Sequence, residues 1–195
     1  AIIDDIQAKY KAESFKVVID NSPVKLSGDR MDVRVRETNL GNAVADALLD
    51  YGQSDFTHKS NLAVTNGGGL RETIAKDKPI TKGDIIAVLP FGNSVAQIQV
   101  TGQNIYDMFV KSLGSILQVN ESGKNVFDEN GQPLLEPSGG FLQVAGARVY
   151  YDTTLPTEKR ILSIDILDPE TGVYKPLNTT ETYYLVTNDF LACWW

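Results

Sequence analysis

A short apolar run that ends in three consecutive glycines constrains this chain more than any other stretch. Leu62-Ala63-Val64 predicts a buried strand, and Thr65-Asn66-Gly67-Gly68-Gly69-Leu70-Arg71 follows it directly. Glycines lack a Cβ, so the backbone around Gly68 can adopt positive φ and come close to a ligand. Asn66 offers an amide before the glycines, and Arg71 offers a planar cation after them that suits a phosphate or carboxylate.

The glycine run also has a plainer interpretation, as a tight turn after a strand. It is not a P-loop, because no Lys-Ser or Lys-Thr follows it, and it lacks the G-x-G-x-x-G spacing of a dinucleotide-binding loop. Further along, Leu89-Pro90-Phe91-Gly92-Asn93 places an aromatic ring in a turn outside any apolar stripe. Together the two stretches indicate a site for a small anionic ligand that carries a flat ring.

Composition excludes several other classes of protein. A length of 195 residues suffices for one large domain or two small ones with a real core. A net charge of -7 makes the chain a poor partner for nucleic-acid polymers, although a single nucleotide needs only one or two arginines. Cys193 and His58 are the single cysteine and histidine, which rules out an intrachain disulfide and Cys/His metal clusters. We predict no membrane span and no signal peptide.

Several stretches predict helices. Residues 1–13 have helical apolar spacing, and Thr38-Asn39 caps a second helix whose apolar stripe comprises Leu40, Val44, Ala47, Leu48 and Tyr51. Residues 81–84 form a capping box before a short helix that leads to Phe91. Thr101-Gly102 begins another helix, whose buried face comprises Ile105, Met108, Phe109 and Leu113.

The remaining segments predict strands and one long surface excursion. Strands are expected at 17–19, 31–36, 96–100, 141–151, 162–166 and 182–186, with a turn at 168–172. In the second of these, Arg34 and Arg36 share a face that solvent would cover. Residues 120–140 are polar and rich in glycine, and we expect them at the surface. Early helices and late strands favour an α/β or α+β fold with a mixed sheet.

Five motifs in this order resemble the C-terminal domain of the 5'-nucleotidase family, which includes UDP-sugar hydrolases and 2',3'-cyclic-nucleotide phosphodiesterases. They cover nearly the whole chain and comprise Arg34-Val35-Arg36-Glu37-Thr38-Asn39-Leu40-Gly41-Asn42, Asn66-Gly67-Gly68-Gly69-Leu70-Arg71, Leu89-Pro90-Phe91-Gly92-Asn93, Phe141-Leu142-Gln143-Val144-Ala145-Gly146 and Thr187-Asn188-Asp189-Phe190-Leu191-Ala192. Several motifs in register are far more specific than any one of them.

The resemblance implies a four-layer α/β/β/α fold and a set of ligand contacts. Phe91 and Phe190 correspond to the two rings that stack on the base in the family. Stacking of this kind is typically worth about 1–3 kcal/mol per base. The resemblance further gives Asn66 and Asn93 to the nucleoside and Arg34 and Arg71 to the phosphate, and it counts Gly68 among the substrate-binding residues. From the residues alone, core packing remains the alternative for both phenylalanines.

The resemblance also implies a larger protein around this chain. Residues 1–13 would be the remnant of a hinge helix, and residues 14–195 a substrate-binding domain that stops before the family's Gly-Gly-Asp-Gly stretch. Trp194 and Trp195 stand where that stretch would begin, which puts ribose recognition in question. Two divalent metal ions would lie in an N-terminal metallophosphatase domain, where they activate water and stabilise the leaving oxygen. This chain has no cofactor of its own in that scheme, and we expect it to be inactive alone.

The same resemblance implies a protein of nucleotide catabolism that is extracellular, periplasmic or bound to the cell surface. Two alternatives stay open. One is a hydrolase of the same superfamily that acts on a sulfur compound and has no use for two stacking rings. The other is a non-catalytic surface module used for binding. Convergence of Phe91, Phe190 and Arg71 on one cleft would favour the nucleotide.

Overall fold

A four-stranded mixed sheet forms the centre of the molecule in the computed structural model, which describes residues 2–193. Its strands stand in the order β4 (Val95–Thr101), β9 (Thr182–Asn188), β2 (Leu62–Asn66) and β5 (Leu142–Ala145). Strand β2 runs parallel to β9 and antiparallel to β5, and β9 runs antiparallel to β4. The predicted buried strand at Leu62-Ala63-Val64 is confirmed, and it occupies an interior position of the sheet.

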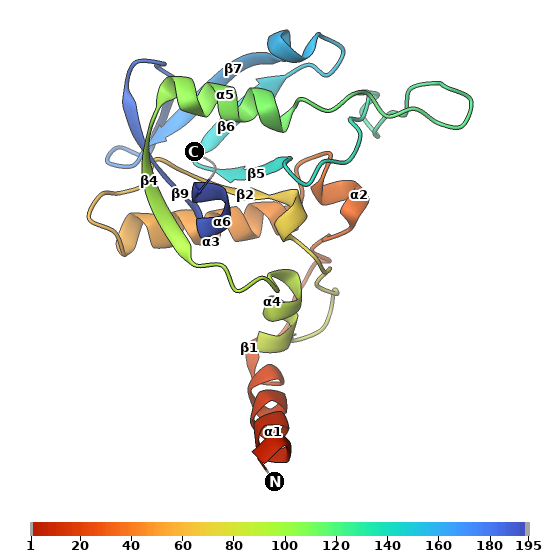
Figure 1. The fold of residues 1–195 in the computed structure, drawn as a ribbon, viewed down its shortest axis with the longest axis vertical. Helices are drawn as coiled ribbons and strands as arrows, with labels where there is room; N and C mark the ends of the chain where they lie inside the picture. The colour runs from red at the N-terminus through yellow and green to blue at the C-terminus, as the bar shows by residue number, and fades with distance from the viewer. Residues whose placement is uncertain (1, 194–195) are drawn as a thin grey trace.

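A second sheet of three antiparallel strands, β6 (Ala147–Tyr151), β7 (Ile161–Asp168) and β8 (Val173–Pro176), lies above the first in Figure 1. The chain passes from one sheet to the other at Gly146. This residue has a φ of 69°, and a Cβ there would lie 2.3 Å from the carbonyl oxygen of Asn61. Only glycine fits that crossing.

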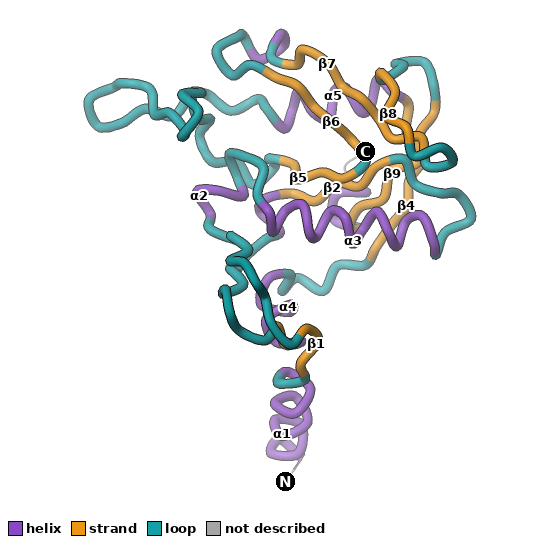
Figure 2. The backbone as a smooth tube through the Cα atoms, turned by 180° about the vertical axis from the view of Figure 1, so that it is seen from behind, coloured by secondary structure: helices purple, strands orange, loops and turns teal. Residues whose placement is uncertain are grey.

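Helices cover the two faces of the central sheet. Helix α3 (Asn39–Ser54) packs on one face, while α5 (Gly102–Ser112) and the three-stranded sheet pack on the other (Figures 1 and 2). The largest apolar cluster joins Ile105 and Phe109 of α5 to Leu185 of β9 and Ile166 of β7. The predicted α/β fold with mixed sheets is confirmed.

Helix α3 begins where the sequence predicts, and Leu40, Val44 and Leu48 of the predicted stripe pack against the core. Thr38 is the N-cap and accepts a hydrogen bond from the Gly41 N–H. Ala47 and Tyr51, both assigned to the apolar stripe, are exposed, and the small residues Ala45 and Gly52 are buried instead. The helix lies so close to the sheet that small side chains form the contact.

A stalk extends from the layered body in Figures 1 and 2. It comprises α1 (Ile2–Ser14), β1 (Val17–Ile19), β3 (Ile80–Thr81) and α4 (Lys82–Val88), and β1 pairs with β3. The predicted helix at residues 1–13 is confirmed for its described part, and α1 buries none of its described residues. The predicted capping box at Thr81 and Asp84 is present.

The strand predicted at residues 31–36 is wrong. Helix α2 (Arg30–Val33) occupies this segment, because Asp29 caps it by accepting a hydrogen bond from the Met31 N–H. Asp32 then accepts from Arg36 one turn later, which also favours helical geometry. These local side-chain bonds override the alternating pattern of apolar residues.

Residues 120–140 form the predicted surface excursion, which reaches out from the body in Figure 1 and contains isolated β-bridges but no regular strand or helix. Its base returns to the core at Leu135, which is buried. No helix within residues 2–193 is long and apolar enough to cross a membrane.

Candidate functional site

A cleft of about 910 Å³ opens at one end of the central sheet. Its walls come from the loop that follows β2, the segment that follows α4, the C-terminal end of α5, the loop before β5 and the short helix α6 (Asp189–Ala192). Five of the predicted site residues line it: Asn66, Gly68, Phe91, Asn93 and Phe190. The volume lies within the range of small-molecule pockets.

The sheet explains why Phe91 and Phe190 lie on the same cleft. Strand β4 begins at Val95 where β9 ends, and Val95 is paired with Asn188. The Asp189 N–H then donates to the Ser94 carbonyl at 2.9 Å, which joins the two segments just beyond the strands. Phe91 precedes this junction and Phe190 follows it, so the pairing brings both rings to one end of the sheet.

Both rings are exposed rather than packed in the core. Phe91 is 58% exposed and Phe190 is 53% exposed. Gly92, the next residue, has a φ of 64°, a conformation that glycine adopts readily. The chain therefore turns directly after Phe91. The core-packing alternative for the two phenylalanines is therefore wrong in this structure.

The glycine loop folds differently from the expectation. Gly67–Gly69 form a 3-10 turn, η1, and none of the three has a positive φ. Because these residues have no Cβ, other backbone segments of the protein pack directly against them. A Cβ on Gly67 would lie 2.0 Å from the Val33 carbonyl oxygen, and a Cβ on Gly68 would lie 3.0 Å from the Gly139 carbonyl oxygen. Asn66 is fixed by donating from Nδ2 to the same Gly139 carbonyl at 3.0 Å.

Two predicted arginines stand beside the cleft rather than in its lining. The guanidinium carbon of Arg71 lies 5.6 Å from the centre of the Phe91 ring, and Arg71 Nη1 donates to the Gly68 carbonyl at 3.4 Å. The side chain of Arg34 approaches Gly139, which does line the cleft. Of the three residues expected to converge, Phe91 and Phe190 line the cleft, and Arg71 is outside the lining but contacts Phe91.

The neighbourhood of Arg34 is strongly positive. Burial lowers the pKa of Arg34 below its ordinary value, and the charges of Arg30 and Arg71 lower it further. Among the described residues Arg34 has no ion pair, and its Nε is buried without a hydrogen-bond partner. Like charges that lie close together repel one another, and an anion placed between them would relieve that repulsion.

Arg30 was not among the predicted site residues, because it precedes the strand that the sequence predicts at residues 31–36. It lies in the first turn of α2, one helical turn before Arg34. The spacing of four residues is the signal that could have found it, since such residues lie on the same side of a helix.

The buried Arg160 supports a different wall of the cleft and was also missed. Its guanidinium donates to the carbonyls of Leu113, Ser115 and Leu155, the last two at 2.6 and 3.1 Å. Ser115 lines the cleft, so this arginine fixes the loop after α5. Burial lowers the pKa of Arg160 as well.

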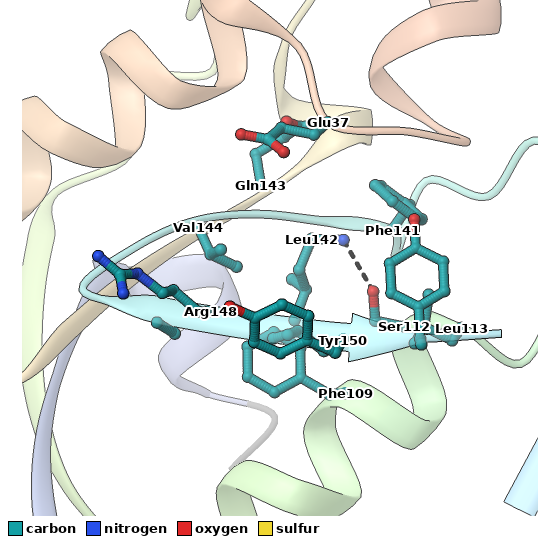
Figure 3. Close-up of a pocket in the computed structure, with 13 residues that line it drawn as sticks. Glu37, Phe109, Ser112, Leu113, Phe141, Leu142, Gln143, Val144, Arg148 and Tyr150 are labelled. Atoms are coloured by element: carbon teal, nitrogen blue, oxygen red, sulfur yellow. Dashed lines mark hydrogen bonds between the residues drawn. The ribbon is translucent and has the colours of Figure 1, made fainter. Parts of the chain in front are cut away.

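A smaller pocket of about 310 Å³ lies behind this cleft, between β5 and β6 (Figure 3). Leu142 and Ser112 form part of both walls, and the Leu142 N–H donates to Ser112 Oγ at 2.9 Å. The rest of its lining is mostly apolar and includes Phe109 and Tyr150. None of the predicted site residues lines this pocket, so the larger cleft is the candidate site.

Within residues 2–193, no group of three or more His, Cys, Asp or Glu side chains could hold a metal ion. His58 lies at the surface and stacks on Tyr184, with ring centres 4.3 Å apart. Trp194 and Trp195 lie outside the described residues. The cleft lining includes aromatic rings and amides, and guanidinium groups stand beside it.

Comparison with known proteins agrees with the geometry. The sequence matches the family model described as 5'-nucleotidase, C-terminal domain, over residues 17–193. The trifunctional nucleotide phosphoesterase protein YfkN of Bacillus subtilis (strain 168) is 32% identical over 194 residues, which are 95% of this chain and 12% of that protein. A snake venom 5'-nucleotidase of Gloydius brevicauda is 30% identical over 211 residues, covering 98% of this chain and 32% of the relative.

Among solved structures, the 5'-nucleotidase precursor from Thermus thermophilus is similar with a TM-score of 0.72 and 32% identity. The match covers 97% of this chain and 32% of that one. This chain thus spans about a third or less of each of these relatives.

Proposed function

The chain belongs to the 5'-nucleotidase family, as a C-terminal domain, and we propose that it is the part of such a hydrolase that binds the nucleotide. In this proposal the base lies between Phe91 and Phe190, and Asn66 and Asn93 bond the nucleoside. Arg34 and Arg71 bind the phosphate, with Gly68 beside it.

One observation carries the proposal: two exposed phenylalanines from distant parts of the chain line the same cleft. Both rings line one cleft, where they present apolar surface that a flat ligand can contact. A nucleobase has two apolar faces and fits between two rings. Arg71 lies over the Phe91 ring and Arg34 approaches Gly139 of the cleft lining, and neither forms an ion pair with a described residue, so both charges are near enough to meet a phosphate attached to the nucleoside.

Catalysis belongs to the larger protein in this proposal. The described residues of this chain do not fit a two-metal site, and the two divalent metal ions implied by the family would lie in an N-terminal metallophosphatase domain. Residues 1–13, the outer part of the stalk, would connect the two domains as a hinge, and residues 14–195 would form the binding domain. The isolated chain would bind without hydrolysing. A secreted or surface location is supported by a relative from snake venom.

Calorimetry with adenosine tests the stacking. We expect Phe91→Ala and Phe190→Ala each to weaken adenosine binding about fivefold or more, because loss of one stacking ring typically costs about 1–3 kcal/mol. Phe127→Ala is the matched control, since Phe127 is 56% exposed but lies on the excursion, outside the cleft lining. Absence of adenosine and AMP binding by the unaltered chain would overturn the proposal.

A crystal structure with a bound nucleoside provides a second test. The ring centres of Phe91 and Phe190 should then lie about 7 Å apart, with the base in van der Waals contact with both. A nucleoside bound elsewhere, such as the pocket behind Leu142, would assign the cleft another role.

A further inference from the structure

Gln143 carries an amide side chain and is buried in the interior of the protein, with only 1% of its surface exposed. It lies in the middle of β5 and pairs with Thr65 of β2. Figure 3 shows its side chain on the same side of the strand as Glu37, opposite to Leu142 and Val144. A buried amide is costly unless its donors and acceptor are satisfied, so its partners indicate what it does.

All three of its hydrogen bonds go to one short segment, residues 33–38. Nε2 donates to the carbonyls of Val33 at 3.0 Å and Arg36 at 2.7 Å, and Oε1 accepts from the Thr38 N–H at 3.1 Å. A single side chain therefore satisfies two backbone carbonyls and one backbone N–H of this segment. The segment joins α2 to α3, and it carries Arg34.

The backbone of Arg34 is also enclosed from the side of the cleft. The Ser138 N–H donates to the Arg34 carbonyl at 3.0 Å, and the Val33 carbonyl occupies the space where Gly67 would carry a Cβ. The side chain of Arg34, in contrast, has no ion pair among the described residues, and its Nε has no hydrogen-bond partner. The backbone of Arg34 is therefore held by neighbouring segments, and it sets the point from which the side chain extends toward Gly139.

We infer that Gln143 is a positioning residue that holds Arg34 at the Gly139 edge of the cleft and so determines the preference for a phosphorylated ligand over a bare nucleoside. This inference rests on the proposed function. Gln143 lines the smaller pocket and is not among the residues that line the cleft, so in this inference it acts on the ligand through the segment that carries Arg34.

The test compares binding of AMP and adenosine by calorimetry in the 195-residue chain. Gln143→Met keeps the length of the side chain and removes all three hydrogen bonds. Thr187→Val is the matched control, because Thr187 is fully buried in the same sheet and donates to the Val64 carbonyl at 2.8 Å without touching residues 33–38. Should Gln143→Met fail to fold, Gln143→Asn retains the amide but ends one methylene short of its partners and gives the same comparison.

We expect Gln143→Met to weaken AMP binding about tenfold or more while adenosine binding changes by less than about twofold, and Thr187→Val to change neither. In an Arg34→Ala background, Gln143→Met should cause no further loss of AMP binding, because the residue through which it acts is gone.

Equal losses for AMP and adenosine, or a full further loss in the Arg34→Ala background, would overturn the inference alone and make Gln143 a purely structural residue. An unchanged AMP affinity would do the same. If the unaltered chain bound neither compound, the proposed function would fall, and the inference with it.

Discussion

Arg34 and Arg160 are both partly or wholly removed from solvent, and in both burial lowers the pKa of the guanidinium. Their surroundings differ in one respect. Arg160 donates to three backbone carbonyls, whereas Arg34 has a buried Nε without a partner and two arginines for neighbours. The protein supplies hydrogen-bond acceptors to the guanidinium of Arg160. It supplies none to the buried Nε of Arg34 among the described residues.

The two arginines differ in how the protein compensates for their loss of hydration. A buried cation must recover its lost hydration, and backbone carbonyls do this for Arg160 at the end of α5. Near Arg34 the charges of Arg30 and Arg71 lower its pKa further, and its Nε has no hydrogen-bond partner among the described residues. We expect replacement of Arg160 to lower stability and replacement of Arg34 to lower affinity.

The largest effect should follow from Arg160→Met. The carbonyls of Leu113, Leu155 and Ser115 would lose a charged donor, and a buried group left unpaired typically costs about 1–3 kcal/mol. We expect the free energy of unfolding to fall by about 2–4 kcal/mol in urea denaturation. Arg148→Met is the control, since Arg148 is exposed and lies over the ring of Tyr174. If the free energy of unfolding fell no more than in the control, the hydrogen bonds of Arg160 would not contribute to stability.

Arg34→Met should show the opposite behaviour. Removing a charge that is close to two like charges should leave the free energy of unfolding within about 0.5 kcal/mol of the unaltered chain, or raise it. AMP binding should weaken about tenfold or more, because a charge-assisted hydrogen bond is typically worth about 1.5–3 kcal/mol. Calorimetry and urea denaturation on the same samples measure both. A clear loss of stability with unchanged affinity would reverse the roles of the two arginines.

Arg71 sharpens the comparison because it is exposed and contacts Phe91. Arg71→Ala should weaken AMP binding about tenfold and adenosine binding much less, since only AMP carries the phosphate. Titrations of the two ligands at equal ionic strength measure the difference. Equal losses would mean that Arg71 acts by holding the Phe91 ring through the cation–π contact.

The smallest effect concerns an exposed ion pair, where solvent screens the charges. Asp168 has a pKa of about 2, below the ordinary value of 3.8, because Lys175 Nζ donates to it and the Glu170 N–H does so as well. A carboxyl with a lowered pKa in the folded state stabilises the fold above its unfolded pKa, and this contribution disappears as the pH falls from about 4 to about 2. Asp168→Asn should therefore reduce the acid sensitivity of the melting temperature in that interval and lower stability slightly near neutral pH. An unchanged acid transition would argue against this origin of the shift.

Much of the fold was predictable because local patterns and tertiary packing agree there. The strand at Leu62-Ala63-Val64, the capping box at Thr81 and the buried face of α5 all follow from rules that act within a few residues. The segment 31–36 was not predictable in this way, since Asp29 and Asp32 form local bonds that alternation of apolar residues does not reveal.

Close packing is the second limit of sequence reasoning. Hydrophobic periodicity selects large residues such as Tyr51, yet α3 contacts the sheet through Gly52, where a Cβ would lie 2.6 Å from Val186 Cγ1. The glycine loop is packed closely as well, since its missing side chains make room for Val33 and Gly139.

In the candidate site, the positions of Phe91 and Phe190 were predictable through the family resemblance and not through periodicity, because the β4–β9 pairing joins segments far apart in the chain. Gln143 and Arg160 are invisible to sequence patterns for the same reason, since their partners are backbone atoms of remote segments.

The pairing of β2 with β9 also has a kinetic consequence. The strand that completes the sheet is the last one made, so a growing chain holds β2 and β4 without the partner that separates them. Contacts between remote segments slow folding, because the loop between them must close first. The domain should therefore fold in milliseconds to seconds rather than microseconds, only after synthesis has passed β9, and its cleft and its core should form in the same step.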